Sequence, residues 1–200
     1  MKKKILALTL VFALALALGI GGTVAWLTAQ TSPVVNTFTV GDINITLAET
    51  TGNNYTFVPG DTLAKDPKVT VLEGSEACYL FVKVTDSNNT ITDENNNNKI
   101  INWEVNTAIW TPVNEHPGYW YKEVAQGVGS DGFAVFTDNI STDTKVGSVK
   151  ISEQVTKEMV NTLNTNKPTI TVTAAAVQKD NVADVTAAWA KLPTAFTTTP

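Results

Sequence analysis

The most regular feature of the chain is the alternation of apolar and polar residues in short runs separated by Gly, Pro, Asn and Asp. Alternation with a period of two places successive side chains on opposite faces of a β-strand. The clearest run is Cys78–Val84, and Thr169–Val177 near the carboxyl end alternates almost as cleanly. The other predicted strands are Phe38–Val40, Ile43–Leu47, Tyr55–Val58, Lys68–Leu72, Ile100–Val105, Tyr119–Val124, Phe133–Phe136 and Val146–Ile151.

Many short strands that do not alternate with helices indicate an antiparallel architecture. The pattern therefore predicts a mainly β protein, an antiparallel β-sandwich of jelly-roll type. Helical spacing of apolar residues predicts two short helices, Ser152–Leu163 and Asn181–Leu192, the second after the last strand. The polar, Asn-rich segment Asp86–Asn98 is predicted as a loop.

The first residues have the composition of a secretory signal peptide. Three lysines, Lys2 to Lys4, precede an uncharged Leu- and Ala-rich run, and small residues then offer cleavage after Ala25 or, second, after Ala29. An uncleaved membrane anchor is the alternative, because the uncharged stretch is long enough to span a bilayer. In both cases we expect the remaining chain to lie outside the cytoplasm, and contact with the membrane only through an uncleaved signal.

These features predict one folded domain. We expect residues 1–25 to be the signal peptide, 26–37 a flexible N-terminal segment, 38–192 a single β-sandwich domain, and 193–200 a disordered tail. The full length of 200 residues is typical of a single core rather than of two comparable domains.

The composition excludes several classes of partner. The chain has 14 basic residues, all of them Lys, against 19 acidic residues, and its net charge is -5. The predicted signal removes three lysines and no acid, so the mature charge would be -8. An acidic chain without Arg is a poor match for nucleic acid. A single Cys allows no internal disulfide, which fits a protein exported by a Gram-positive cell.

Residues for catalysis are scarce. One His and one Cys cannot form the common zinc sites, and no H-E-x-x-H or G-x-S-x-G motif is present. His116 lies in an Asn-Glu-His-Pro-Gly segment that predicts a surface turn, and Cys78 lies within an apolar strand. Gly127–Gly132 lacks the lysine of a phosphate loop and predicts a hairpin turn. We therefore predict that the protein is not an enzyme.

One segment resembles a calcium-binding loop. Asp93, Asn95 and Asn97 stand at the first, third and fifth positions of an EF-hand-like pattern, and Glu104 stands at the twelfth. Asn98 occupies the position that normally requires Gly. The flanking residues are predicted as strands rather than helices, so the alternative is a solvated hairpin loop without a metal.

Aromatic residues cluster in the middle of the chain, at Trp103, Trp110, Trp120, Tyr119 and Tyr121. In a strand, Tyr119 and Tyr121 would share one face and Trp120 would lie on the other. An open Tyr face could stack on sugar rings, which would make the protein a wall-associated carbohydrate-binding or ligand-binding module. The alternative is that these residues fill the two faces of a sandwich strand.

Four segments resemble a known family of exported proteins. Gly19–Trp26 (GIGGTVAW) and Asn36–Leu47 (NTFTVGDINITL) are similar to the beginning of TasA and camelysin-type precursors, which a SipW-type signal peptidase processes. Pro59–Asp66 (PGDTLAKD) resembles an internal motif of the same family. Ala174–Leu192 (AAAVQKDNV…AAWAKL) is similar to the last strand and terminal helix of SipW-dependent proteins. The resemblance covers both ends and one internal motif, but not Ser87–Gln154.

The resemblance implies a jelly-roll protein secreted to the cell surface or biofilm matrix, where the best-known members form extracellular fibres. In those members the mature N-terminal segment donates a strand to a neighbouring subunit. Here Leu27–Val40 is uncharged, and Val34, Val35, Phe38 and Val40 are the candidate donor residues. The expected partners are other copies of the chain and, during export, the signal peptidase. The alternative is a monomer in which Phe38–Leu47 is the first strand.

The camelysin name carries a metalloprotease label. The residues of this chain do not support it, because the zinc ligands and general base of such an enzyme are missing from the sequence. Metalloprotease activity is therefore the most remote of the three functional alternatives.

Overall fold

The computed structural model describes residues 41–52, 55–56, 58–92, 97–127, 131–137, 148–156, 159, 163 and 166–198. All of these belong to one compact unit, Val40–Pro200. The described part is mainly β, with antiparallel pairing throughout, and it confirms the predicted fold class. None of its helices is long and apolar enough to cross a membrane.

A four-stranded sheet in the order β12-β4-β9-β8 forms the centre of the molecule. Its strands are β4 (Cys78–Ser87), β8 (Thr111–Pro112), β9 (Tyr119–Val124) and β12 (Thr169–Gln178). β4 pairs with β12 along its entire length, from Cys78 opposite Gln178 to Ser87 opposite Thr169. β9 pairs with β4 only as far as Tyr119, which stands opposite Lys83.

Smaller sheets lie beside the central one. The first contains β1 (Ile45–Ala48), β3 (Lys68–Val71) and β10 (Phe133–Ala134) in the order β1-β3-β10. The second contains β2 (Thr62–Ala64), β7 (Ile101–Asn102) and β11 (Ser148–Ile151) in the order β2-β11-β7. β5 (Thr90–Thr92) and β6 (Asn97–Lys99) form a separate hairpin.

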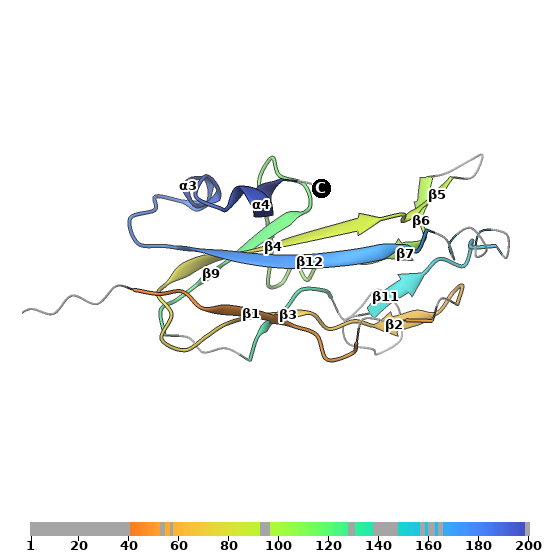
Figure 1. Ribbon diagram of the computed structural model, residues 1–200, viewed down its shortest axis with the longest axis horizontal. Coiled ribbons are helices and arrows are strands. Elements are labelled where there is room, and N and C mark those ends of the chain that lie inside the picture. Colours follow the sequence, from red (N-terminus) through yellow and green to blue (C-terminus); the bar gives the residue numbers. More distant parts are fainter. Residues whose placement is uncertain are drawn as a thin grey trace, which may run out of the picture. The chain divides into compact units, whose positions relative to one another are not determined.

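The described unit has three layers, visible in Figure 1: the β1-β3 sheet, the central sheet, and the helices α3 (Val185–Trp189) and α4 (Thr194–Thr197). Alternation along β4 explains this arrangement, because even-numbered residues face the β1-β3 sheet and odd-numbered residues face the helices. Leu80 and Val82 belong to the first core, whereas Tyr79 and Phe81 belong to the second. β4 is therefore buried on both faces from Cys78 to Val84.

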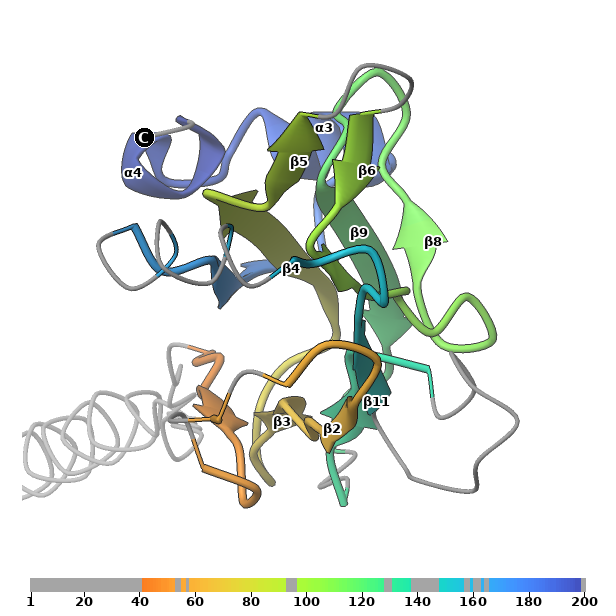
Figure 2. The same cartoon turned by 90° about the vertical axis from the view of Figure 1, so that its right-hand side faces the viewer.

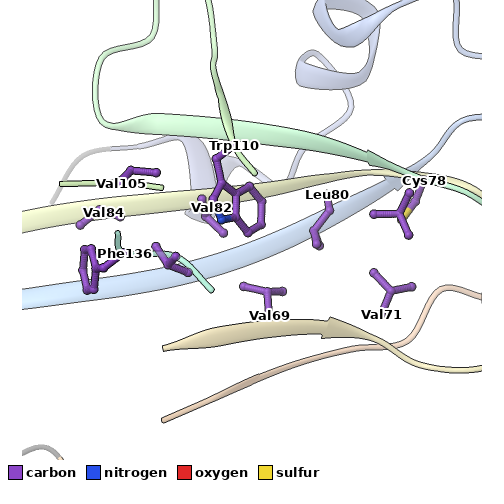
Figure 3. Packing of buried hydrophobic residues seen from close by; sticks show 11 residues of the cluster. Val69, Val71, Cys78, Leu80, Val82, Val84, Val105, Trp110 and Phe136 are labelled. Atoms are coloured by element: carbon purple, nitrogen blue, oxygen red, sulfur yellow. The ribbon is translucent and has the colours of Figure 1, made fainter. Parts of the chain in front are cut away.

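The core between the two sheets is the larger one. Val69 and Val71 from β3 point toward Leu80 and Cys78 from β4, and Trp110 fills the space beside them (Figure 3). All five residues are at most 1% exposed. Burial of each large side chain of this kind contributes about 1.5–3 kcal/mol. This core fixes the central sheet, and with it the positions of the sheet's two edges.

Several predicted elements differ from the structure. The Asp86–Asn98 segment is not a simple loop, because β4 continues to Ser87 and β5 and β6 form a hairpin. The side chain of Asn89 holds its base: Oδ1 accepts from the backbone N–H of Ile101, and Nδ2 donates to the Ile101 carbonyl. Polar residues thus form strands here through backbone and amide hydrogen bonds, which apolar periodicity does not reveal.

The carboxyl-terminal residues also differ from the expected disordered tail. Thr194–Thr197 form α4, and Phe196 is buried against Tyr119 at a ring distance of 5.7 Å. The helix predicted at Asn181–Leu192 is shorter than expected, because α3 begins after Asp184, whose carboxylate accepts a hydrogen bond from the Ala187 N–H as an N-cap. α3 follows the last strand, as predicted, whereas α4, which also follows it, was not predicted.

Two further segments deserve comparison with the prediction. Of Tyr55–Val58, the described residues Tyr55, Thr56 and Val58 lie outside any strand, and Tyr55 donates its hydroxyl to the Gly52 carbonyl. The helix predicted at Ser152–Leu163 lies largely outside the described residues. Met159 and Leu163, which are described, pack against a third core of Ile100, Ile101, Val149 and Val155.

Candidate functional site

The most unusual feature of the central sheet is the outer edge of β12. β12 has ten residues, and within the described part of the chain only β4 pairs with it. Its sequence, TITVTAAAVQ, contains no charge and no proline. Natural edge strands are usually short or carry Lys, Pro or bulges, which prevent the addition of a foreign strand. β12 has none of these protections.

The register shows which backbone groups of β12 face outward. Lys179 donates its N–H to the Ala77 carbonyl, in the pair that continues the β12–β4 register. In an antiparallel pair, residues alternate between hydrogen-bonded and non-hydrogen-bonded positions. The odd-numbered residues of β12 are therefore bonded to β4. The N–H and C=O groups of Ile170, Val172, Ala174 and Ala176 point toward the open side.

The side chains at this edge form an incompletely covered apolar row. Ile170, Val172, Ala174 and Ala176 pack against the main core, yet each of them stays partly exposed. β1, which is the edge strand of the neighbouring sheet, lies beside β12. Leu47 on β1 is 40% exposed. The sandwich is thus less well covered along the β1 and β12 side than at its centre.

A second candidate site is an open cleft of about 560 Å³ at the end of β4. It forms because β9 begins only at Tyr119, whereas β4 and β12 continue side by side as far as Ser87 and Thr169. Gly118 makes the turn into β9 with a φ of 86°, a backbone conformation that favours glycine. Its carbonyl accepts the N–H of Val84, the last bond between β4 and this segment.

Asp86 is the central polar residue of this cleft. Its Oδ2 accepts hydrogen bonds from Asn89 Nδ2 at 2.9 Å, Lys99 Nζ at 3.0 Å and Trp103 Nε1 at 3.0 Å. Burial tends to raise the pKa of the Asp86 carboxyl, but the bonds from Asn89, Lys99 and Trp103, together with the charge of Lys99, lower it. Asp86 therefore carries its negative charge at neutral pH.

The predicted calcium loop is only partly described. Asp93 and Asn95 lie outside the described residues, Asn97 stands opposite Thr92 in the β5–β6 hairpin, and Glu104 follows β7. No group of three or more His, Cys, Asp or Glu residues suited to a metal occurs among the described residues. The calcium site remains a prediction.

The Tyr face considered for sugar binding is covered by the carboxyl-terminal helices. Tyr119 is buried, its ring lies 4.8 Å from that of Trp189, and its hydroxyl donates to the carbonyls of Phe196 and Thr197. Tyr121 lies half-buried between Tyr79 and Phe81. These residues fill the second core, and an open Tyr platform does not exist in the described structure.

The tryptophans lie on the opposite face of the sheet. Trp103 and Trp120 make an edge-to-face contact at 6.2 Å, and both stay partly exposed. Trp110 is buried, and its Nε1 donates to the Ala134 carbonyl at 2.8 Å. Trp103 and Trp120 line the cleft at the end of β4, whereas Trp110 belongs to the core.

His116 and Cys78 both pack against other residues. His116 stacks on Trp189 with ring centroids 3.9 Å apart, in the turn that precedes β9. Cys78 is fully buried at the beginning of β4, and burial raises the pKa of its thiol to about 11. A thiol with such a pKa is a poor nucleophile at neutral pH.

The residues predicted for export and strand donation fall outside the description. Ala25, Ala29, Val34, Val35, Phe38 and Val40 all precede residue 41, where the described structure begins. The cleavage sites and the donor segment therefore remain predictions. Among the described residues, β12 pairs with β4 alone, and no described strand pairs with its other edge.

Comparison with known proteins adds no match. No family model fits the chain, and neither the curated proteins nor the solved structures contain a matching one. The resemblance to TasA and camelysin-type proteins thus rests on the sequence segments alone, and function must be argued from the residues themselves.

Proposed function

We propose that the protein is an exported structural subunit of the cell surface or biofilm matrix, which assembles into fibres by strand addition. Signal removal would free the uncharged segment Leu27–Val40, and this segment would then pair with β12 of a neighbouring copy. The observation that supports the proposal is the ten-residue β12 edge, which lacks the usual protections against pairing.

The backbone groups of β12 are suited to an additional strand. Four residues, Ile170, Val172, Ala174 and Ala176, direct N–H and C=O groups outward in the derived register. The donor segment is longer than β12 and has a single interruption, Pro33, which cannot donate a ladder hydrogen bond. Residues after Pro33 provide an uninterrupted stretch for pairing.

The apolar side chains are also complementary. In an extended donor, Val34, Phe38 and Val40 share one face because they stand at even-numbered positions. That face would continue the partly exposed row on β12 and bury it against the main core. Burial contributes about 25 cal/mol per Å² of apolar surface, so even partial coverage of this row favours assembly.

The absence of charge on both partners favours the same conclusion. Leu27–Val40 and Thr169–Gln178 contain no Lys, Asp or Glu, although the predicted mature chain carries a net charge of -8. Repulsion between acidic copies would therefore be weak at the pairing strands themselves, and screening by salt would reduce it elsewhere. We expect assembly to accelerate as ionic strength rises.

The first experiment compares the secreted protein with a variant that lacks Leu27–Thr37. We expect the intact protein to form fibres in electron microscopy, and the deletion variant to remain a folded monomer in sedimentation. Normal fibres from the deletion variant would refute strand donation by this segment. Mass determination of the secreted amino terminus establishes which residues are present in the fibre.

The second experiment tests β12 as the acceptor. The deletion variant should bind a synthetic peptide of residues 27–40, and Ala174→Pro in that variant should abolish binding. The Ala174 N–H points outward, so the proline removes a bond to the donor but none to β4. The same peptide with Phe38→Asp serves as the matched control. If the peptide of residues 27–40 binds the Ala174→Pro variant as tightly as before, β12 is excluded as the acceptor strand.

The two alternatives have distinct signatures. A wall-associated binding module would retain its ligand after deletion of Leu27–Thr37. A camelysin-like metalloprotease would cleave protein substrates and lose that activity on addition of a chelator. Either result in the absence of fibres would replace the structural role.

A further inference from the structure

We propose that the helix-covered face of the central sheet binds a singly charged oxyanion group, a carboxylate or a phosphodiester. Lys83 and the hydroxyls of Thr85 and Thr171 would hold this group. All three residues line the open cleft at the end of β4, so solvent reaches them. The proposal is independent of strand addition at β12, because it concerns side chains on one face of the sheet and not the backbone groups at its edge.

Lys83 is a buried cation without an ionic partner. It is 7% exposed, and among the residues that the structure describes it is the only charged residue that is buried. Its Nζ donates to the Thr198 carbonyl at 2.6 Å and lies 5.3 Å from the centre of the Tyr119 ring. None of the ion pairs in the described chain includes it. A buried charge that faces only a carbonyl and a ring is stabilised by pairing with an anion.

Two threonine hydroxyls lie beside this lysine on the same face of the sheet. Lys83 and Thr85 are both odd-numbered residues of β4, about 6.6 Å apart along the strand, and Thr171 of β12 stands directly opposite Thr85. The next pair along the strands, Ser87 and Thr169, is bonded hydroxyl to hydroxyl at 2.7 Å. The described chain gives the Thr85 and Thr171 hydroxyls no such partner. One ammonium and two hydroxyl groups therefore lie on one side of the sheet.

Helix α4 fixes the position of the ammonium group. α4 lies over the same face of the sheet (Figure 1), and the Tyr119 hydroxyl donates to the carbonyls of Phe196 and Thr197. With the bond from Lys83 to Thr198, three consecutive carbonyls at the end of the helix receive donors. An ammonium has three N–H groups, so two of those on Lys83 remain for a ligand.

The charge and the donors of this face select an anion over other ligands. Asp86 is the only carboxylate among the residues that line the cleft, and as an even-numbered residue of β4 it lies on the opposite face of the sheet. A cation would be repelled by Lys83, and an apolar ligand would leave the ammonium and both hydroxyls without acceptors. An oxyanion accepts from all three groups, and hydrogen bonds between charged partners are the stronger ones.

A single lysine limits the ligand to one negative charge. The other lysine of the cleft, Lys99, is bonded to Asp86 and lies 4.6 Å over the Trp103 ring, so it belongs to the opposite face. A second negative charge on the ligand would remain unpaired, on a chain whose net charge is already -5. A carboxylate and a phosphodiester each carry one charge and two terminal oxygens, and they share the chemistry that this face recognises.

The test measures binding to the secreted, full-length monomer by nuclear magnetic resonance at neutral pH and low ionic strength. The probes are acetate and dimethyl phosphate, and methyl acetate and trimethyl phosphate are their neutral controls. We expect millimolar or tighter binding of at least one anion, with shifts of the Lys83, Thr85 and Thr171 amides, and much weaker binding of its neutral control. The anion that binds more tightly identifies the class. Binding by neither anion, equal binding of the neutral control, or shifts confined to other residues would overturn the proposal.

A matched pair of variants locates the site. Lys83→Met removes the ammonium and keeps an unbranched side chain, and it should weaken binding of the anion at least about tenfold, the effect of a charged hydrogen bond. Lys122→Met makes the same change in net charge, but Lys122 lies over the Phe133 ring and does not line the cleft. Equal weakening by the two variants would assign the binding to the general charge of the protein and contradict the site.

A second variant decides the question if Lys83→Met disturbs α4. The double variant Thr85→Val and Thr171→Val removes both hydroxyls and leaves the bond from Lys83 to the Thr198 carbonyl in place. It should weaken binding of the anion about fivefold to a hundredfold, the effect of two hydrogen bonds. If the double variant binds the anion as tightly as the intact protein, the proposal is wrong, whereas fibre assembly at β12 is unaffected by this result.

Discussion

The two outer strands of the central sheet, β12 and β8, differ in length and in the backbone N–H groups at their free edges. β12 directs N–H groups outward from four residues and has neither charge nor proline. β8 has two residues: Thr111 occupies a hydrogen-bonded position opposite Tyr121, and Pro112 has no N–H to offer. Figure 2 shows β8 outside β9, on the side away from β4. In the described chain, β12 thus has outward N–H groups that an added strand would need, whereas β8 has none.

The cores behind the two edges also differ, because side chains are more completely buried behind β8 than behind β12. Behind β8, Trp110 is 1% exposed and fills the space between the sheets. Behind β12, Val172 and its neighbours are only partly covered. The β8 edge is therefore short, has no outward backbone N–H and covers a tightly packed core. A long and partly uncovered edge is the kind of surface to which the proposed donor strand would add.

Hydrogen exchange should separate the two kinds of amide within β12 itself. In the monomer we expect the N–H groups of Thr171 and Thr173 to be protected at least about a thousandfold more than those of Val172 and Ala174, because only the former bond to β4. Nuclear magnetic resonance measures this residue by residue. Equal protection of neighbouring amides in the monomer would mean that β12 is already paired on both sides.

In fibres the same measurement should give a different result. Val172 and Ala174 should gain protection on assembly, whereas Thr171 and Thr173 should change little. If all four amides keep their monomer exchange rates in the fibre, assembly uses another surface.

Trp110→Ala should be the most destabilising single substitution at the β8 side. It removes a fully buried indole and leaves the Ala134 carbonyl without its donor, so we expect a loss of about 3–5 kcal/mol in the free energy of unfolding. Denaturant titration of the monomer measures it. Trp110→Phe is the control that retains the ring, and it should recover part of the loss.

Val172→Ala should cost far less in the monomer. Its side chain is only partly buried, so removal of two methyl groups should lower the free energy of unfolding by about 1 kcal/mol or less. The same substitution should raise the protein concentration needed for fibre growth. A loss as large as that of Trp110→Ala would show that the β12 side is packed as tightly as the β8 side.

Acid should produce the smallest effect, at the loop that follows β1 on the open side. Asp66 accepts the backbone N–H groups of Thr50 and Thr51 and both of their hydroxyls. Burial tends to raise the pKa of this carboxyl, but these hydrogen bonds lower it from 3.8 to about 2. The stabilisation is therefore complete above pH 3.8 and is lost as pH falls through about 2.

Thermal unfolding across this pH range measures the contribution. As pH falls through this range, we expect a small decrease in the melting temperature of the intact protein. The decrease should be smaller in the Asp66→Asn variant, because that variant has no carboxyl at position 66 to protonate. A pH dependence identical in both proteins would assign the acid sensitivity to other carboxylates, of which Asp86 is the next with a lowered pKa.

Sequence periodicity predicted the strands that have a buried face. Cys78–Val84 lies within β4, Tyr119–Val124 coincides with β9, and Thr169–Val177 lies within β12. These strands bury alternate residues, so their side chains carry the signal. The sequence did not predict β5, β6 and β8. Backbone hydrogen bonds and the side chain of Asn89 hold β5 and β6, and β8 has only two residues, one of which is a proline. α4 was missed because one residue, Phe196, anchors a Thr-rich end.

The candidate sites depend on information that periodicity does not contain. The pattern of Thr169–Val177 is that of any half-buried strand, and its position at a sheet edge follows only from the order of strands in space. The cleft arises because β9 begins at Tyr119 while β4 continues to Ser87, a difference in length between paired strands. The sequence predicts a donor segment, which lies outside the described residues, but it does not predict where that segment could bind.

Labelling of Cys78 can measure how often the two sheets separate. Its thiol is fully buried between the two sheets at the beginning of β4, and its pKa of about 11 keeps it protonated. A thiol-specific reagent can therefore react only when the sheets separate. The rate of labelling under native conditions then measures the frequency of this opening. A natural single-cysteine chain thus allows its opening kinetics to be followed, in monomer and fibre alike, without any engineered label.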